Sequence, residues 1–171
     1  EGLINSNEIT IKGSLLDNED GQILGETVTI AGKIIENQRG ILLAKDLNIT
    51  GDKLNTEEGL IQGTLVSLEI KEKLTNTKGQ IYGEESLKIA TKVVENEEGK
   101  LLSNLELNIE GTEKIDKIKG EIAGSLESLK ADDLLNEGGE IRTDKGLELE
   151  IKRLNNNDGE IYSTERIKGA G

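Results

Sequence analysis

The sequence contains no cysteine, histidine, proline, methionine, phenylalanine or tryptophan, and only two tyrosines. Without cysteine the chain cannot form disulfides or thiolate metal sites, and without histidine no serine has the usual partner that activates it as a nucleophile. Aromatic side chains supply much of an ordinary globular core. Because aliphatic residues are plentiful instead, we expect a narrow interior that admits only branched aliphatic and small side chains.

Acidic residues outnumber basic ones, 34 to 21, and long apolar runs are absent from the sequence. The formal net charge is −13, which argues against nucleic-acid binding, since phosphate contacts require a basic surface, and against attraction to anionic membranes. No stretch approaches the ~18 consecutive apolar residues that a spanning helix requires. We therefore expect neither a nucleic-acid partner nor insertion into a membrane.

A repeat occupies the whole chain. Its pattern, aliphatic-x-Asn-x-x-Gly-x-aliphatic, is complete in residues 16–23, and successive glycines of the pattern lie 19 to 21 residues apart. These glycines are Gly2, Gly21, Gly40, Gly59, Gly79, Gly99, Gly120, Gly139 and Gly159. A period of this length indicates an array in which each unit contacts only its neighbours, so we treat residues 1–171 as a single repeat segment.

Two aliphatic columns run through the units, one five residues before the glycine, as at Leu16, and one two residues after it, as at Ile23. The residue four places after the glycine is always small, and a second segment with alternating aliphatic residues follows, as in residues 9–11. Alternation with period two is typical of strands. Since no unit is long enough for its own hairpin sheet and parallel crossovers are nearly always right-handed, we predict an all-β, right-handed parallel β-helix (β-solenoid) of about eight to nine coils.

Polar residues form columns as well. Asparagine stands three residues before most of the glycines, at Asn18, Asn37, Asn76, Asn96, Asn136 and Asn156. Because asparagine tolerates left-handed backbone conformations and stacked amides can hydrogen-bond along a rod, we predict a structural Asn ladder, with a row of polar ligands as the alternative. The residue directly before the glycine alternates in charge from Asp20 to Lys119, which predicts a surface charge ladder that favours the correct register.

Apolar residues also occupy positions one and three places after the glycine, which should face outward. They are Leu24, Ile41, Leu43, Leu60, Tyr82 and Leu102, and we call them the apolar stripe. Exposed apolar patches usually mark contact surfaces, so the stripe is our candidate contact surface. The alternatives are that a side loop covers these residues or that the outward assignment slips by one residue.

The coil around residues 111–134 is irregular. Its glycine, Gly120, comes 21 residues after Gly99, which is the longest spacing in the chain. The coil also has Lys117 where asparagine is expected, Ile118 at an otherwise polar position and an additional Leu126. These departures predict a β-bulge or a short insertion, with a recognition feature as the alternative.

Carboxylates are abundant, but adjacent pairs such as Glu57-Glu58 and Asp132-Asp133 fall in turns or loops beside like charges. A sugar-cleaving site needs two carboxylates that flank one bond, and only Tyr82 and Tyr162 could serve as aromatic platforms. The turn at 155–159 lacks the alternating acidic ligands of a calcium loop. We therefore expect no enzyme, no catalytic residue, no cofactor and no specific metal site, and keep a polysaccharide-acting β-helix enzyme as an alternative.

The unit at residues 74–83, followed by the strand-like residues 87–89, resembles the repeats of filamentous haemagglutinin-like exoproteins. Asparagine, glycine, inward aliphatic residue, small residue and second strand recur at matching offsets over essentially the whole chain. The resemblance implies a bacterial protein exported by two-partner secretion through an outer-membrane transporter, with a β-helical shaft at the cell surface. Members of this family act as adhesins, which bind a receptor or glycan on a host or neighbouring cell, or carry a toxin in contact-dependent growth inhibition.

The family's amino-terminal secretion domain and carboxy-terminal effector have no counterpart in this sequence. We therefore expect a structural or adhesive shaft segment of a longer, secreted or surface-displayed exoprotein. Another polymerising β-solenoid scaffold is the remaining alternative. Because neither end carries an obvious capping segment, we also expect the isolated fragment to associate end to end.

Overall fold

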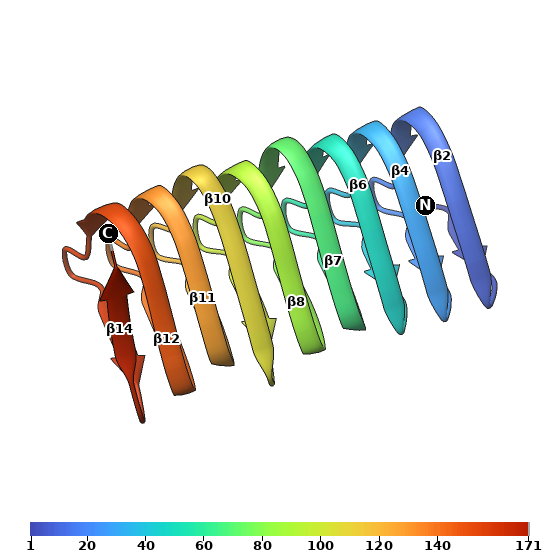
Figure 1. The fold of residues 1–171 in the computed structure, drawn as a ribbon. Helices are drawn as coiled ribbons and strands as arrows, with labels where there is room; N and C mark the ends of the chain where they lie inside the picture. The colour runs from blue at the N-terminus through green and yellow to red at the C-terminus, as the bar shows by residue number, and fades with distance from the viewer. Residues whose placement is uncertain (171) are drawn as a thin grey trace.

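The computed structural model describes residues 1–170 and shows a parallel β-solenoid of about eight coils. The coils stand side by side in chain order, from the blue N-terminal coil to the red C-terminal coil (Figure 1). The described residues contain strands and turns only, and no helix among them is long and apolar enough to cross a membrane. The predicted fold class is confirmed.

All strands belong to one 14-stranded sheet, and every pair is parallel. The strands are β1 (Leu3–Asn5), β2 (Glu8–Asp17), β3 (Gln22–Leu24), β4 (Thr27–Glu36), β5 (Ile41–Leu43), β6 (Asp46–Asn55), β7 (Leu60–Thr75), β8 (Gln80–Glu95), β9 (Lys100–Ser103), β10 (Glu106–Asp116), β11 (Glu121–Leu135), β12 (Glu140–Asn155), β13 (Glu160–Ser163) and β14 (Ile167–Ala170).

Each strand pairs with its equivalent one coil away. Val28 pairs with Leu47, for example, and Ile61 with Ile81. Additional residues enter at corners of the coil, where the register shifts. One such shift lies between Gly111 and Lys114, inside the stretch with the predicted insertion, and appears in the ladders to both neighbouring coils. Further shifts occur in the ladders of β6, β7 and β11, so irregular corners are not restricted to residues 111–134.

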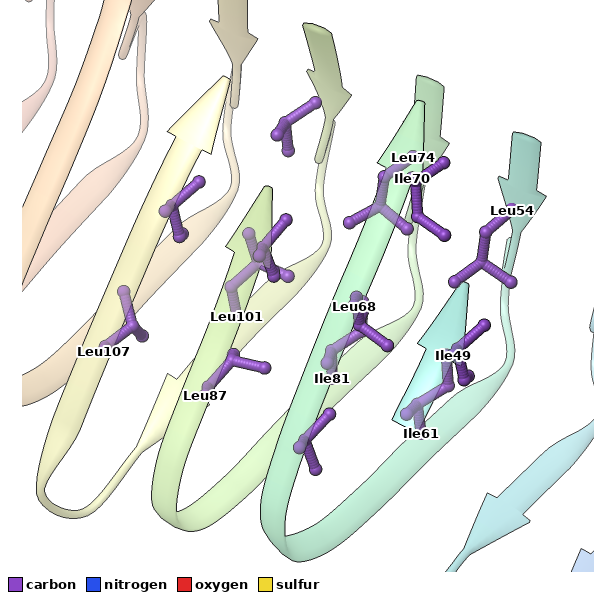
Figure 2. Close-up of a cluster of buried hydrophobic side chains, with 14 of the residues drawn as sticks. Ile49, Leu54, Ile61, Leu68, Ile70, Leu74, Ile81, Leu87, Leu101 and Leu107 are labelled. Atoms are coloured by element: carbon purple, nitrogen blue, oxygen red, sulfur yellow. The ribbon is translucent and has the colours of Figure 1, made fainter. Parts of the chain in front are cut away.

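Inward aliphatic columns form the core. Ile61, Ile81 and Leu101 stack from coil to coil and are 0% exposed, and Figure 2 shows these side chains between the walls of successive coils. Each such residue contributes about 1.5–3 kcal/mol on burial. Burial depends on having a coil on both sides, because the equivalent Ile4 in the first coil is 47% exposed.

A four-residue turn opens each coil. In the turn Asn76–Gly79, the Gly79 N–H donates to the Asn76 carbonyl oxygen at 3.0 Å. Positive φ occurs at the third residue, Lys78 (φ 55°), which is the position that has positive φ in a type II turn. The left-handed residue of these turns is therefore the one before the glycine and not the asparagine.

The glycine that follows is required by close packing rather than by its φ. A Cβ at Gly99 would lie 2.1 Å from the Asn76 carbonyl oxygen of the preceding coil and 2.4 Å from the Asn96 Oδ1 atom. Distances this short cannot be accommodated without moving the backbone. The glycine column is thus the space into which the asparagine side chains fit.

We expect opposite effects from substitutions at two adjacent residues of one turn. Glu98→Gly should raise the free energy of unfolding by up to about 1 kcal/mol, because Glu98 has φ 55° and non-glycine residues pay for left-handed backbone. Gly99→Ala should lower the free energy of unfolding by about 1–3 kcal/mol through overpacking. Urea unfolding followed by circular dichroism measures both values. A loss of stability in Glu98→Gly as large as that in Gly99→Ala would contradict this account of the turn.

Candidate functional site

The apolar stripe lies on the outer face of the first strand of successive coils, from β3 to β9. Leu24 pairs with Leu43, Ile41 with Leu60, and Tyr82 with Leu102. Gln62 stands between Leu43 and Tyr82 and interrupts one column. The structure therefore brings the six residues together on one face, in two adjacent columns.

The stripe residues are half-buried except Leu43, which is exposed. Their chain neighbours Ile23 and Leu42 are buried in the core, so the outward assignment does not slip by one residue. A shallow depression lined by Leu24, Leu43, Gln62 and Glu84 adjoins the stripe. Partial burial comes from packing along the columns, and the accessible parts form an aliphatic surface with one phenol.

The Asn ladder runs inside the first corner of the coils. The Asn18 Nδ2 donates to Asn37 Oδ1 at 2.8 Å, and the Asn76 Nδ2 donates to Asn96 Oδ1 at 2.7 Å. Thr56 accepts from Asn37 at 3.0 Å. Each of these asparagines is buried, and its Nδ2 also donates to the carbonyl oxygen of the turn glycine, as from Asn96 to Gly99 at 3.1 Å. The amides thereby bond to one another and to the turns, except that the Asn76 Oδ1 atom has no partner among the described residues.

In the column of charged residues that precede the glycines, one pair of neighbours in adjacent coils, Asp20 and Arg39, forms an ion pair. Arg39 lies 2.9 Å from Asp20 and 2.6 Å from Glu19, and its hydrogen bond to Asp20 lowers the pKa of that carboxyl. None of the later steps from Glu58 to Lys119 has an ion pair within residues 1–170. Because these side chains are largely exposed, each contact has a small effect on stability.

Sequence reasoning missed Glu127. It pairs with Leu107 on one side and Leu147 on the other, and so occupies an inward aliphatic column, where it is 3% exposed. Neither of its carboxylate oxygens has a hydrogen-bond partner among the described residues. Burial raises the pKa of Glu127 to about 9, and the Gly124 amide and the charge of Lys117 oppose that shift only in part.

Lys117 stands in the same coil, at an Asn-ladder position, and is 0% exposed. Its Nζ donates to the Gly120 carbonyl oxygen at 2.9 Å and to the Asn136 Oδ1 atom of the next coil. Burial lowers the pKa of Lys117 to about 8, against the opposing charges of Glu127, Glu140 and Glu121. One coil therefore holds two buried ionisable groups, and both are displaced toward their neutral forms.

The adjacent carboxylate pairs lie at the surface. Asp132 and Asp133 contact Lys152 and Arg153 of the next coil, and Glu57 and Glu58 are exposed. In residues 1–170 no group of three or more acidic side chains could hold a metal ion. The paired carboxylates act here as partners of basic side chains or as solvated charges.

Comparison with protein-family models, with curated proteins and with solved structures finds no match. The resemblance to filamentous haemagglutinin-like repeats therefore rests on the residue offsets alone.

Glu127 should make the stability of the fold depend on pH. Between about pH 4.5 and 9 the folded state retains a proton that the unfolded state releases, so the free energy of unfolding falls with rising pH by up to about 1.4 kcal/mol per unit. Lys117 opposes this trend only above about pH 8, where the folded state loses a proton that the unfolded state keeps.

Glu127→Leu restores the aliphatic column and removes the carboxyl group. We expect it to stabilise the chain more at pH 8 than at pH 5, as measured by urea unfolding at both values. Glu148→Leu, which changes an exposed residue one coil away, is the matched control and should show little dependence of this kind. Equal stabilisation by Glu127→Leu at the two pH values would contradict the pKa shift.

Proposed function

We propose that the chain is a shaft segment of a filamentous haemagglutinin-like exoprotein at the bacterial cell surface, where it spaces other functional regions and attaches through the apolar stripe. The observation that carries the proposal is the continuity of the inward columns over about eight coils. Inward side chains in successive coils pack against one another along the rod, as Leu42 packs between Ile23 and Ile61. Such a solenoid separates the parts at its two ends by a distance that its coil number sets.

Stacking supports the spacing role. Strands of adjacent coils are about 4.8 Å apart, and parallel ladders join every coil to the next, as from β7 to β8. The surface is acidic overall, with a net charge of −13, which favours solubility and discourages unspecific association with like-charged surfaces. Another polymerising β-solenoid scaffold would share these features, whereas the offsets of asparagine, glycine and small residues favour the haemagglutinin-like assignment.

The attachment role rests on the contiguity of the stripe over β3, β5, β7, β8 and β9. Its accessible atoms are mainly aliphatic, with Tyr82 as the one aromatic ring, so it is better suited to an apolar protein surface than to the face of a sugar. We therefore propose a protein receptor on a neighbouring or host cell as the partner.

We expect the labelled chain to bind bacterial or host cells at physiological salt and a stripe variant to lose this binding. In that variant Leu24, Leu43, Tyr82 and Leu102 are all changed to serine, which leaves the inward columns intact. Flow cytometry should show at least a tenfold loss of affinity, since truncating several central apolar contacts costs more than about 1.4 kcal/mol in total. Protease treatment of the cells should abolish binding, whereas loss after glycosidase treatment would indicate a glycan partner.

The matched control changes four exposed leucines outside the stripe, Leu15, Leu65, Leu105 and Leu126, to serine. These leucines are more exposed than the stripe residues, so the control removes at least as much accessible leucine surface and should still bind as the unmodified chain does. An equal loss in both variants would show unspecific hydrophobic adsorption, and binding that survives in the stripe variant would contradict the assigned surface. Absence of binding by the unmodified chain would limit the proposal to a passive shaft.

The isolated chain should also associate end to end, because inward residues at both ends are half exposed: Ile4 is 47% and Leu154 is 49% exposed. Sedimentation velocity should show species that grow with concentration. Leu154→Lys should suppress them by placing a charge in the contact, whereas Leu65→Lys on the side of the rod should not. A strict monomer at high concentration would count against this association.

A further inference from the structure

An amine and a carboxamide meet inside the solenoid at Lys117 and Asn136. Both residues are 0% exposed, and the Lys117 Nζ donates to the Asn136 Oδ1 atom across the interface between two adjacent coils. Among the described residues Lys117 forms no ion pair within 4.0 Å. The Asn136 Cγ atom is therefore one bond away from an oxygen that the lysine nitrogen already contacts, and neither side chain is exposed to solvent.

Hydrogen bonds fix the orientation of the Asn136 carboxamide. The lysine ammonium has donors only, so Asn136 must present its oxygen to Lys117. The Asn136 Nδ2 atom points to the next coil, where it donates to Asn156 Oδ1 at 2.7 Å and to the Glu160 carbonyl oxygen at 3.2 Å. At the other ladder steps with an asparagine acceptor, the donor is an amide of another asparagine, which is a poor nucleophile. Lys117 is the one amine at a ladder position in residues 1–170.

Glu127 is a third buried group in the same coil. Its carboxylate oxygens have no hydrogen-bond partner among the described residues, and in its ionised form it is the carboxylate that raises the pKa of Lys117 most. Burial raises the pKa of Glu127 to about 9 and lowers that of Lys117 to about 8. Burial thus displaces both groups toward their neutral forms, and the neutral amine is the form of Lys117 that can act as a nucleophile. The surface carboxylates Glu121 and Glu140 act on Lys117 more weakly.

We propose that Lys117 and Asn136 react to form an isopeptide bond that covalently joins two adjacent coils. The lone pair of the neutral Lys117 amine attacks the Asn136 Cγ atom and forms the Nζ–Cγ bond. The Cγ–Nδ2 bond then breaks, and Nδ2 leaves as ammonia with a proton that Nζ gives up. The products are one secondary amide and one ammonia, so the reaction requires no oxidant, reductant or co-reactant.

Glu127 makes no hydrogen bond to either reacting group among the described residues, so we place only Lys117 and Asn136 in the reaction. The inference is independent of the proposed attachment function.

Intact-mass spectrometry of the unmodified chain tests the bond directly. The expected mass is lower than that of the printed sequence by one ammonia. After trypsin, residues 115–119 and 131–142 should appear as one branched peptide, because trypsin does not cleave after an acylated Lys117. An intact mass equal to that of the sequence, with separate peptides on either side, would overturn the proposal without any need for a variant.

Variants identify which side chains supply the nucleophile and the carboxamide. Lys117→Arg should retain the full mass, and Asn136→Asp should lose water instead of ammonia if it condenses. A mass loss that persists in Lys117→Arg would overturn the assignment of the nucleophile.

Discussion

Stacking of each coil on the next is the constraint on which the structure depends. A coil has too little interior to bury its own aliphatic side chains, so each inward residue is covered by its equivalents above and below, as Leu42 is by Ile23 and Ile61. Every column must then carry a residue of compatible size in every coil. Any polar group that enters the interior must find its partner there as well, because water is excluded. The asparagine amide nitrogens meet this condition by bonding to neighbouring ladder side chains and to the turns, whereas the Asn76 Oδ1 atom lacks a partner among the described residues.

The column constraint explains why the fold could be predicted from the sequence. Positions counted from the glycine remain aligned as far as the first strand, so the inward places of Ile23 and Ile61 and the outward place of Tyr82 follow from simple offsets. The turn was predicted less well. General preferences assign the left-handed conformation to asparagine, whereas the chain places it at Lys78 and its equivalents and uses asparagine for hydrogen bonds.

Glu127 shows where counting from the glycine fails. The register shifts at the corner between Gly124 and Leu126, so an offset from Gly120 no longer tells which residues of the second strand point inward. Alignment of the second strands themselves would have placed Glu127 in line with Leu107 and Leu147. No sequence pattern could show that Lys117 reaches the carboxamide of the next coil, because that contact depends on the length of its side chain and the direction in which it extends.

The ladder hydrogen bonds also determine how the rod responds to mechanical tension. Bonds between parallel coils lie along the rod axis, so a pull on the two ends is transmitted through one interface after another, in series. Tensile strength is then set by the weakest interface rather than by the sum of all of them. The interfaces on either side of Glu127 place a carboxyl group against leucine, and the rod should part there before it parts elsewhere. A bond from Lys117 to Asn136 would bridge the interface toward Leu147 but not the one toward Leu107.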